Sequence, residues 1–336
     1  MVHFSSSLWP IHYKPLPDEL LSCWLVRLAH GHGMKVQTFC NVIFGNHHQV
    51  WNRDIDRLAP SWLLSELSNK TYTPMARVLN TTLRSYEGLL YPKFRPAGAL
   101  QWVLVLQMYH RKRKGYGLQF CPLCLNKDDV PYFRKQWRIA LNTVCQLHGT
   151  MLLDRCPICS SPVAVHRLDM RMRDFIASEP LSLCHICGFD LRRASTVDKT
   201  VLDIKSSDMI FRSCLTLNAP FSEWDLGRYS VLHHICRIMT TRYKHAKLRE
   251  FVLDQIGESD ISLTPGKMSF EMRSIEERHF IIQLGAWILS DLRTRLSDAW
   301  RSGSVRYNLL LKDFDSPPIW YLNLVSELSN WRSRNI

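Results

Sequence analysis

Two consecutive sets of metal-ligand side chains lie between residues 121 and 187, and they constrain the folding of this chain more than any other feature. The first set consists of Cys121, Cys124, Cys145 and His148. The second set consists of Cys156, Cys159, Cys184 and Cys187. Two ligands separated by two residues can hold one ion, and a second pair some twenty residues later closes a tetrahedron around it. The sequence therefore predicts two zinc ions, each in its own small finger or ribbon module.

Both predicted zinc sites are complete, because each has four protein ligands. A catalytic zinc site keeps one position for water, whereas a structural site is closed by protein, so we expect structural ions that stabilise the fold. A disulfide framework is the alternative, but an odd total of 11 cysteines and the expected absence of a signal peptide argue against it. The other cysteines have apolar neighbours and are expected to be buried thiols: Cys23, Cys40, Cys214 and Cys236.

The formal net charge of the 336-residue chain is +13, and most of the excess precedes the first zinc set. Residues 1–120 carry 14 Lys and Arg against 6 Asp and Glu. Basic blocks attract nucleic-acid phosphates, so we expect nucleic-acid contacts from one such block, although a solvated loop would have the same composition. The block consists of Arg111, Lys112, Arg113 and Lys114. No apolar run is long enough to cross a bilayer, and no membrane partner is expected.

A mainly α-helical fold with three parts is expected. The parts are a helical region over 1–120, a tandem zinc-binding region over 121–190 and a helical C-terminal domain over 191–336. In the first part, a helix near 17–28, a Gly-containing turn and a second helix near 36–44 outline a helix-turn-helix-like unit.

Hydrophobic periodicity predicts the remaining elements. In the N-terminal part, helices are expected over 54–67 and 74–90, and a buried helix or strand over 99–109. Residues 132–139 alternate apolar and polar side chains in the manner of a strand. In the C-terminal part a period near 3.6 residues predicts helices over 224–243, 246–256, 275–300 and 320–331.

We recognise no sequence motif for catalysis in this chain. Neither Gly31-His32-Gly33 nor Gly115-Tyr116-Gly117 is followed by the lysine of a phosphate-binding loop. No Ser, His and Asp arrangement and no pair of carboxylates stands out as a catalytic set. A zinc hydrolase or nuclease would need an open zinc position or a carboxylate cluster. We therefore expect no enzyme activity and assign no catalytic residue.

Two patterns in the first 190 residues together resemble the TniQ/TnsD family, whose members select target sites for Tn-type transposons. The first is the opening helix from Leu16 to Ala29, LPDELLSCWLVRLA. The second is the series CPLC at 121–124, CQLHG at 145–149 and CPIC at 156–159. This chain has Cys23 where the family pattern has Ser. The chain is also shorter than TnsD-like members that carry an additional DNA-reading domain at the C-terminus.

The resemblance implies a non-catalytic adaptor in DNA transposition. Members of this family link a target-recognition element to an AAA+ transposition regulator, TnsC or TniB, which recruits the transposase. The recognition element is an RNA-guided CRISPR Cascade-type complex or the target DNA itself, and the short chain favours the complex. The resemblance also implies a bacterial cytoplasmic, nucleoid-associated protein, with a homodimer as one expected state. The alternatives are a TnsD-like direct reader of target DNA and a stand-alone zinc-finger transcription regulator.

Overall fold

The structure of the protein is a computed structural model. It describes the chain apart from residues 1–6, 47–49, 107–114, 172–179, 219–223, 242–246, 267 and 330–336. Within the described residues the regular elements are helices, and β-type pairs occur only as isolated bridges. The expected mainly α fold with small Cys/His modules is therefore confirmed.

The chain forms two compact units. The N-terminal unit contains Met1–Glu87, Phe94–Gly98 and Val103–Asp198. The C-terminal unit contains Gly88–Lys93, Ala99–Trp102 and Lys199–Ile336. Two short segments that precede the zinc region in sequence thus belong to the C-terminal unit. The three-part division expected from the sequence stays a prediction.

The first two predicted helices are confirmed. In α1 (Leu21–Gly31) nine of the eleven residues are buried, so this helix lies in the core of its unit. The backbone reverses at Gly33, whose φ of +68° is readily adopted by glycine. The chain then enters α2 (Val36–Phe44), which buries Val36, Phe39, Cys40 and Phe44. DNA binding by these two helices as a helix-turn-helix unit stays a prediction.

The next two predicted helices are each divided. Residues 54–67 form α3 (Ile55–Leu58) and the start of α4 (Ser61–Thr71), because Pro60 disfavours a helical conformation at the residue before it. Residues 74–90 form α5 (Met75–Leu79) and the 3-10 helix η1 (Leu83–Tyr86). Between them the hydroxyls of two threonines donate to carbonyl groups three residues earlier, which competes with helix continuation.

Two predicted elements are wrong. Residues 99–106 contain neither a helix nor a strand, and 107–109 lie outside the described residues. Trp102 has a φ of +64° there, and its indole Nε1 donates to the carbonyl of Tyr229 at 3.0 Å inside the C-terminal unit. Residues 132–139 contain the 3-10 helix η2 (Lys135–Arg138) in place of the strand. Arg134 and Ile139, on either side of η2, each form an isolated bridge, to Glu19 and Val103, and the 3-10 turns between them prevent a continuous strand.

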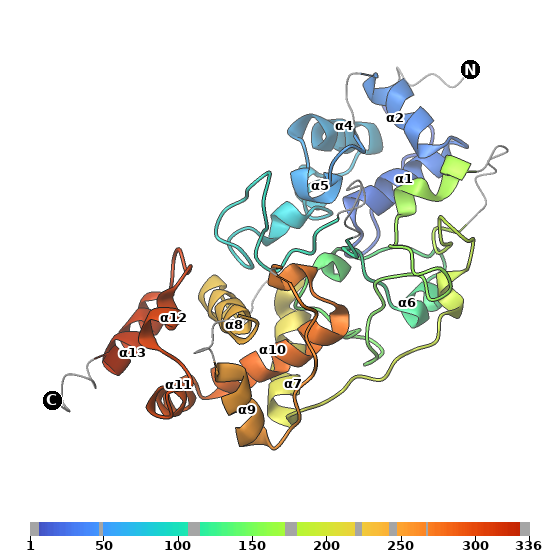
Figure 1. The fold of residues 1–336 in the computed structure, drawn as a ribbon. Coiled ribbons are helices and arrows are strands. Elements are labelled where there is room, and N and C mark those ends of the chain that lie inside the picture. The colour runs from blue at the N-terminus through green and yellow to red at the C-terminus, as the bar shows by residue number, and fades with distance from the viewer. Residues whose placement is uncertain are drawn as a thin grey trace. The chain divides into compact units, whose positions relative to one another are not determined.

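The C-terminal unit is built around α10 (Ile275–Ser290), which packs against α7 (Ile204–Leu215), α8 (Leu226–Met239) and α9 (Leu248–Ile256) (Figure 1). Gly285 allows the close approach of α8, because a Cβ there would lie 2.9 Å from Cys236 Sγ and 3.0 Å from Leu232 Cδ1. The predicted helix 275–300 is divided at Asp291 into α10 and α11. The other helices of this unit are α11 (Leu292–Arg301), α12 (Tyr307–Leu311) and α13 (Ile319–Ser329), with the short 3-10 helices η5 (Thr216–Asn218) and η6 (Phe270–Met272).

Predictions for the other C-terminal segments are largely confirmed. Helices α8, α9 and α13 lie within or close to the predicted ranges, whereas α7 and α12 were not predicted. The cysteines outside the two sets are buried, as expected: Cys23, Cys40, Cys214 and Cys236.

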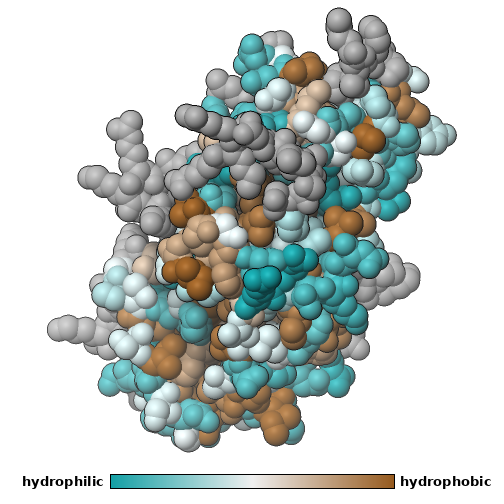
Figure 2. Space-filling model, turned by 90° about the vertical axis from the view of Figure 1, so that its right-hand side faces the viewer, coloured by the Kyte–Doolittle hydropathy of each residue, from teal (hydrophilic) through white to brown (hydrophobic). Residues whose placement is uncertain are grey.

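No helix within the described residues is long and apolar enough to span a membrane. On the face of the molecule in Figure 2, hydrophobic residues lie in separate groups among hydrophilic ones.

Candidate metal centres

The structure brings the first ligand set together in the N-terminal unit. Nδ1 of His148 lies 3.5 Å from Sγ of Cys121, 3.3 Å from Sγ of Cys124 and 3.5 Å from Sγ of Cys145. Sγ of Cys124 lies 3.5 Å from Sγ of Cys145. A tetrahedral zinc ion with Zn–S distances of about 2.3 Å would separate its sulfur ligands by about 3.8 Å. The four donor atoms therefore fit one tetrahedral ion.

The second ligand set forms a similar cluster. Sγ of Cys156 lies 3.6 Å from Sγ of Cys187, and Sγ of Cys159 lies 3.6 Å from Sγ of Cys184. All four sulfur atoms lie within 4.8 Å of one another. Both clusters can bind a metal ion, and their thiolate and imidazole donors suit zinc.

Three of the four ligand pairs are built on the same tight turn. The N–H of the first ligand donates to the carbonyl five residues later, at 2.8 Å for Cys145, 2.9 Å for Cys156 and 2.8 Å for Cys184. The residue after the second ligand has a left-handed φ: +69° at Gly149, +55° at Ser160 and +73° at Gly188. Glycine adopts this conformation without strain, whereas a residue with a Cβ pays a cost of about 1 kcal/mol.

The remaining pair lies at the start of a helix. Cys121 is the N-cap of α6 (Pro122–Lys127), and the N–H of Leu125 donates to its carbonyl at 3.1 Å. Pro122 occupies the first helical position, where its missing N–H costs nothing. Just before the helix, Phe120 pairs with Leu153 through two main-chain bonds of 2.8 and 2.9 Å. This bridge fixes the first centre against the segment that leads to the second.

The two centres differ in burial. In the first, the three cysteines are at most 3% exposed. In the second, Cys187 is exposed and Cys159 is partly exposed. The second centre also has a hydroxyl beside its sulfurs, because Ser161 Oγ lies 3.1 Å from Cys159 Sγ and 3.2 Å from Cys184 Sγ. A hydroxyl that donates to thiolates orients ligands from outside the metal shell.

The segment between the two pairs of the first centre is bonded to the start of α1. The N–H of Leu20 donates to the carbonyl of Phe133 at 3.0 Å, and the N–H of Lys135 donates to the carbonyl of Asp18 at 2.6 Å. The N–H of Phe133 donates to Cys23 Sγ at 3.3 Å. The opening helix α1 and the segment 121–148 that carries the first ligand set, called here the first metal module, therefore belong to one folded unit.

Lys135 is fully enclosed in this region. Its Nζ donates to Asn80 Oδ1 and Ser85 Oγ, both at 2.9 Å, and lies 4.6 Å from the centroid of the Tyr86 ring. Burial lowers the pKa of Lys135 to about 8, and the nearby carboxylate of Asp18 opposes this change. The ammonium group therefore ties η2 to η1 and to the turn that precedes η1, at an electrostatic cost.

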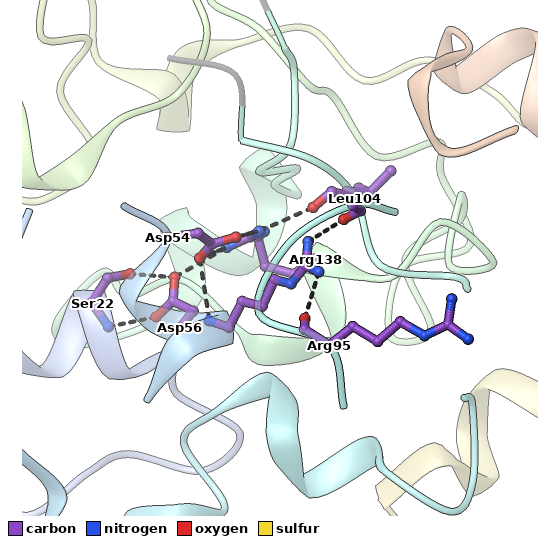
Figure 3. A network of polar contacts seen from close by, with 8 residues as sticks. Ser22, Asp54, Asp56, Arg95, Leu104 and Arg138 are labelled. Atoms are coloured by element: carbon purple, nitrogen blue, oxygen red, sulfur yellow. Dashed lines mark hydrogen bonds and ion pairs between the residues drawn. The ribbon is translucent and has the colours of Figure 1, made fainter. Parts of the chain in front are cut away.

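A second buried cation, Arg138, holds two carboxylates (Figure 3). Its guanidinium contacts Asp54 at 2.5 Å and Asp56 at 3.1 Å, and donates to the carbonyl of Leu104 at 3.0 Å. Asp56 also accepts from the main-chain N–H and the hydroxyl of Ser22 in α1, at 2.7 and 2.9 Å. Burial raises the pKa of Asp56 to about 6, although the Arg138 charge opposes the rise. The network links α1, α3 and the first metal module.

Asp169 makes the corresponding link from the second module. It lies in the 3-10 helix η3 (Val165–Arg171), which is within the loop between the two ligand pairs of the second centre. Its Oδ2 accepts from the main-chain N–H of Val36 at 2.6 Å and lies 3.3 Å from Nε2 of His30. The start of α2 and the end of α1 are thus fixed to the second module, as α1 is to the first.

A small cavity of about 30 Å³ lies beside the Arg138 network. Trp51 and His166 stack in its lining, with ring centroids 4.9 Å apart, and burial lowers the pKa of His166 to about 3, so the imidazole is neutral at pH 7. Small-molecule sites have about 300–1,000 Å³, so this cavity has room for only one or two waters. Each cluster offers four ligand atoms to one ion, the number that a closed structural zinc site uses.

The structure brings together all eight residues that the sequence predicted as metal ligands, but the residues that support them were not predicted. Ser161, Arg138 and Asp56 were not singled out, because no spacing rule marks a buried ion pair or a hydroxyl beside a thiolate. The basic block predicted to contact nucleic acid, Arg111 to Lys114, lies outside the described residues. The adjacent histidines of α8 bond separately, His233 to Glu271 at 2.6 Å and His234 to the carbonyl of Leu310 at 2.8 Å, as adjacent helical positions require.

Residues 10–152 match the family model described as TniQ. The match covers less than half of the chain, includes α1 and the whole first ligand set, and ends before the second set. Among proteins with curated descriptions, none is detectably similar to the chain. The similarity to TniQ is thus established for the region 10–152, which includes the first ligand set, and not for the rest of the chain.

Proposed function

We propose that this chain, whose residues 10–152 form a TniQ domain, is a non-catalytic adaptor that links target recognition to an AAA+ transposition regulator of the TnsC/TniB type. The recognition element in this proposal is an RNA-guided Cascade-type complex. The adaptor acts in the bacterial cytoplasm near the nucleoid, as a monomer or a homodimer. Its contribution to transposition is binding, since each metal centre is closed by four protein ligands.

The observation that carries the proposal is the bonding between the opening helix and the first metal module. The patterns that resemble the family at 16–29 and 121–149 meet through the Leu20–Phe133 and Asp18–Lys135 main-chain bonds. If the helix and the zinc-ligand pattern were unrelated features that occur together by chance, main-chain hydrogen bonds between them would not be expected. The two patterns therefore belong to one folded body, which supports reading them together as a single module.

Two structural zinc ions are part of the proposal. The first would be held by Cys121, Cys124, Cys145 and His148, and the second by Cys156, Cys159, Cys184 and Cys187. Each ion would join two ligand pairs that are about twenty or more residues apart in sequence, which is how zinc stabilises small modules. In this proposal the residues around the centres, such as Ser161 beside the sulfurs of the second set, orient the ligands.

The proposal is tested by binding measurements on the purified, metal-loaded protein. We expect weak, salt-sensitive binding to random duplex DNA and stable co-purification with an RNA-guided complex and the AAA+ regulator. The matched variant replaces Arg111, Lys112, Arg113 and Lys114 with Ala, and should lower association with nucleic acid while its zinc content stays unchanged. Tight binding to one DNA sequence without any such complex would contradict the adaptor function.

Direct reading of target DNA is the second candidate, and the surface of α2 favours it. Gln37, Thr38 and Asn41 are exposed on this helix, as is Val42, whereas the buried residues are Val36, Phe39, Cys40 and Phe44. Side-chain amides of Gln and Asn can pair with adenine in the major groove. Replacing Gln37 and Asn41 with Ala should abolish preference for one duplex sequence if the chain reads DNA directly, and should leave adaptor binding unchanged if it does not.

A further inference from the structure

Tyr72 has an unusual combination of backbone strain and exposure. It follows α4 with φ +50° and ψ +46°, the left-handed conformation. The N–H of Thr73 donates to the carbonyl of Ser68 at 3.0 Å, so Tyr72 occupies the position of a helix C-terminus where glycine is preferred. Its side chain is 80% exposed. An aromatic residue in this conformation destabilises the fold locally, and glycine at this position would avoid that cost.

The contrast with Trp102 shows that burial does not explain this cost. Trp102 also has a left-handed φ, but its ring is fully buried and its indole N–H is bonded to a carbonyl group. Packing therefore offsets the strain at Trp102. The ring of Tyr72 has a cation beside it, with Lys14 Nζ 5.5 Å from its centroid.

Basic and aromatic side chains surround Tyr72. Lys14 Nζ donates to the carbonyls of Thr71 and Tyr72, and Arg77 donates to the carbonyl of Pro15 at 2.7 Å. These contacts place the segment around Lys14 beside the end of α4 and beside α5. Tyr13, next to Lys14, is 46% exposed. We call Tyr13, Lys14, Tyr72 and Arg77 the tyrosine patch.

The two cations of the tyrosine patch are not neutralised by ion pairs with carboxylates in the described part of the chain. Among the ion pairs between described residues, none involves Lys14 or Arg77, and both cations bond to neutral carbonyl groups. The patch thus presents exposed rings beside uncompensated cations. Proteins that bind single-stranded nucleic acid combine these two features, because bases stack on aromatic rings and phosphates bind cations.

We propose that the tyrosine patch binds single-stranded nucleic acid, with one unpaired base stacked on Tyr72 and neighbouring phosphates near Lys14 and Arg77. In a duplex the faces of the bases are covered by their neighbours, so the proposal is specific for single strands. An acidic protein surface would also be attracted to the cations, but it would not need a flat, exposed ring held at a backbone cost. The site is separate from the basic block at 111–114.

The test exploits the strain at Tyr72. Tyr72→Gly removes the ring and relieves the backbone, so it should raise the Tm by about 1–3 °C and weaken binding of a labelled single strand by about 5-fold or more. Tyr72→Phe keeps the ring and should bind like the wild type. Trp320→Ala, which removes a 42% exposed ring from the C-terminal unit, is the matched control and should also bind like the wild type.

The probes are single-stranded DNA, single-stranded RNA and blunt duplex DNA of equal length. Weaker binding of Tyr72→Gly to either single strand, with unchanged binding to the duplex, supports the proposal. The single strand that is affected shows whether the ligand is DNA or RNA. Arg77→Gln should also lower the salt slope of single-strand binding by about 0.7. Equal binding of wild type and Tyr72→Gly to all probes would overturn the proposal, even if Tyr72→Gly lost the AAA+ regulator. An equal loss on the duplex would overturn stacking. Because these probes need no transposition partner, failure here leaves the adaptor proposal untouched.

Discussion

The main-chain N–H of Lys135 donates to the carbonyl oxygen of Asp18 at 2.6 Å, joining residues 117 positions apart in sequence. Asp18 precedes α1, and Lys135 lies between the two ligand pairs of the first metal centre. Together with the Leu20–Phe133 bond, this contact attaches the start of the opening helix to the segment between the two ligand pairs of the first centre. Loss of metal from the first centre should therefore loosen α1 as well as the module itself.

The buried cation of this region gives a pH-dependent prediction. The pKa of Lys135 is about 8 in the folded protein, below its ordinary value of 10.5, so between these values the unfolded chain binds more protons. The contribution of Lys135 to stability therefore increases as pH rises from about 8 towards 10.5. Urea unfolding of wild type and Lys135→Met at pH 7 and pH 9 measures it. The wild type should gain stability relative to the variant at pH 9, and a constant difference would contradict the assigned burial.

The Arg138 network predicts a large loss and a partial rescue. Arg138→Leu leaves two carboxylates without their cation, one of them fully buried, and should lower the free energy of unfolding by about 3–5 kcal/mol. Adding Asp56→Asn removes the buried charge and should recover part of that loss. Urea unfolding of the single and double variants measures the coupling, and strictly additive effects would show that Arg138 and Asp56 do not interact.

The turn of the second metal centre predicts a stabilising substitution. Ser160 has the same left-handed φ as Gly149 and Gly188 at the equivalent positions, so Ser160→Gly should stabilise the metal-bound protein by about 0.5–1 kcal/mol. The matched change Gly188→Ala should destabilise it by at least as much. Thermal unfolding at saturating zinc compares the two, and destabilisation by both would indicate that the Ser160 hydroxyl is needed.

The difference in burial predicts the order of metal loss. A chelator should remove zinc from the second centre first, because Cys187 is exposed whereas the cysteines of the first centre are enclosed. Metal release followed with a chromogenic chelator should show two phases of equal amplitude. Cys187→Ser should remove the fast phase and leave the slow phase, and loss of the slow phase would reverse the assignment.

Local patterns predicted well where the chemistry itself is local. The two Cys/His clusters, α1, α2 and most C-terminal helices could be predicted because residue spacing and the 3.6-residue period act over short distances. The strand expected over 132–139 was wrong because η2 interrupts it, leaving only Arg134 and Ile139 in bridges, to Glu19 and Val103, which are remote in sequence. The element expected over 99–109 failed for a similar reason: Trp102 belongs to the C-terminal unit, which no local pattern around it indicates.

The buried ion pair beside the candidate centres was not predicted for the same reason, because its residues are distant in sequence. Arg138 and Asp56 are 82 residues apart, and each reads in the sequence as an ordinary surface charge. The exposure and conformation of Tyr72 likewise depend on the end of α4, which was expected to stop at residue 67. Pairings between distant segments, and single left-handed residues, therefore needed the structure.

The account is tested most directly by the target sites of a transposition reaction assembled from the transposase, the AAA+ regulator and the recognition complex, with and without this chain. We predict that insertions at the recognised target require the metal-loaded protein, and that leaving it out abolishes them without impairing ATP hydrolysis by the regulator. Insertions at the recognised target at an unchanged rate in its absence would contradict the adaptor function.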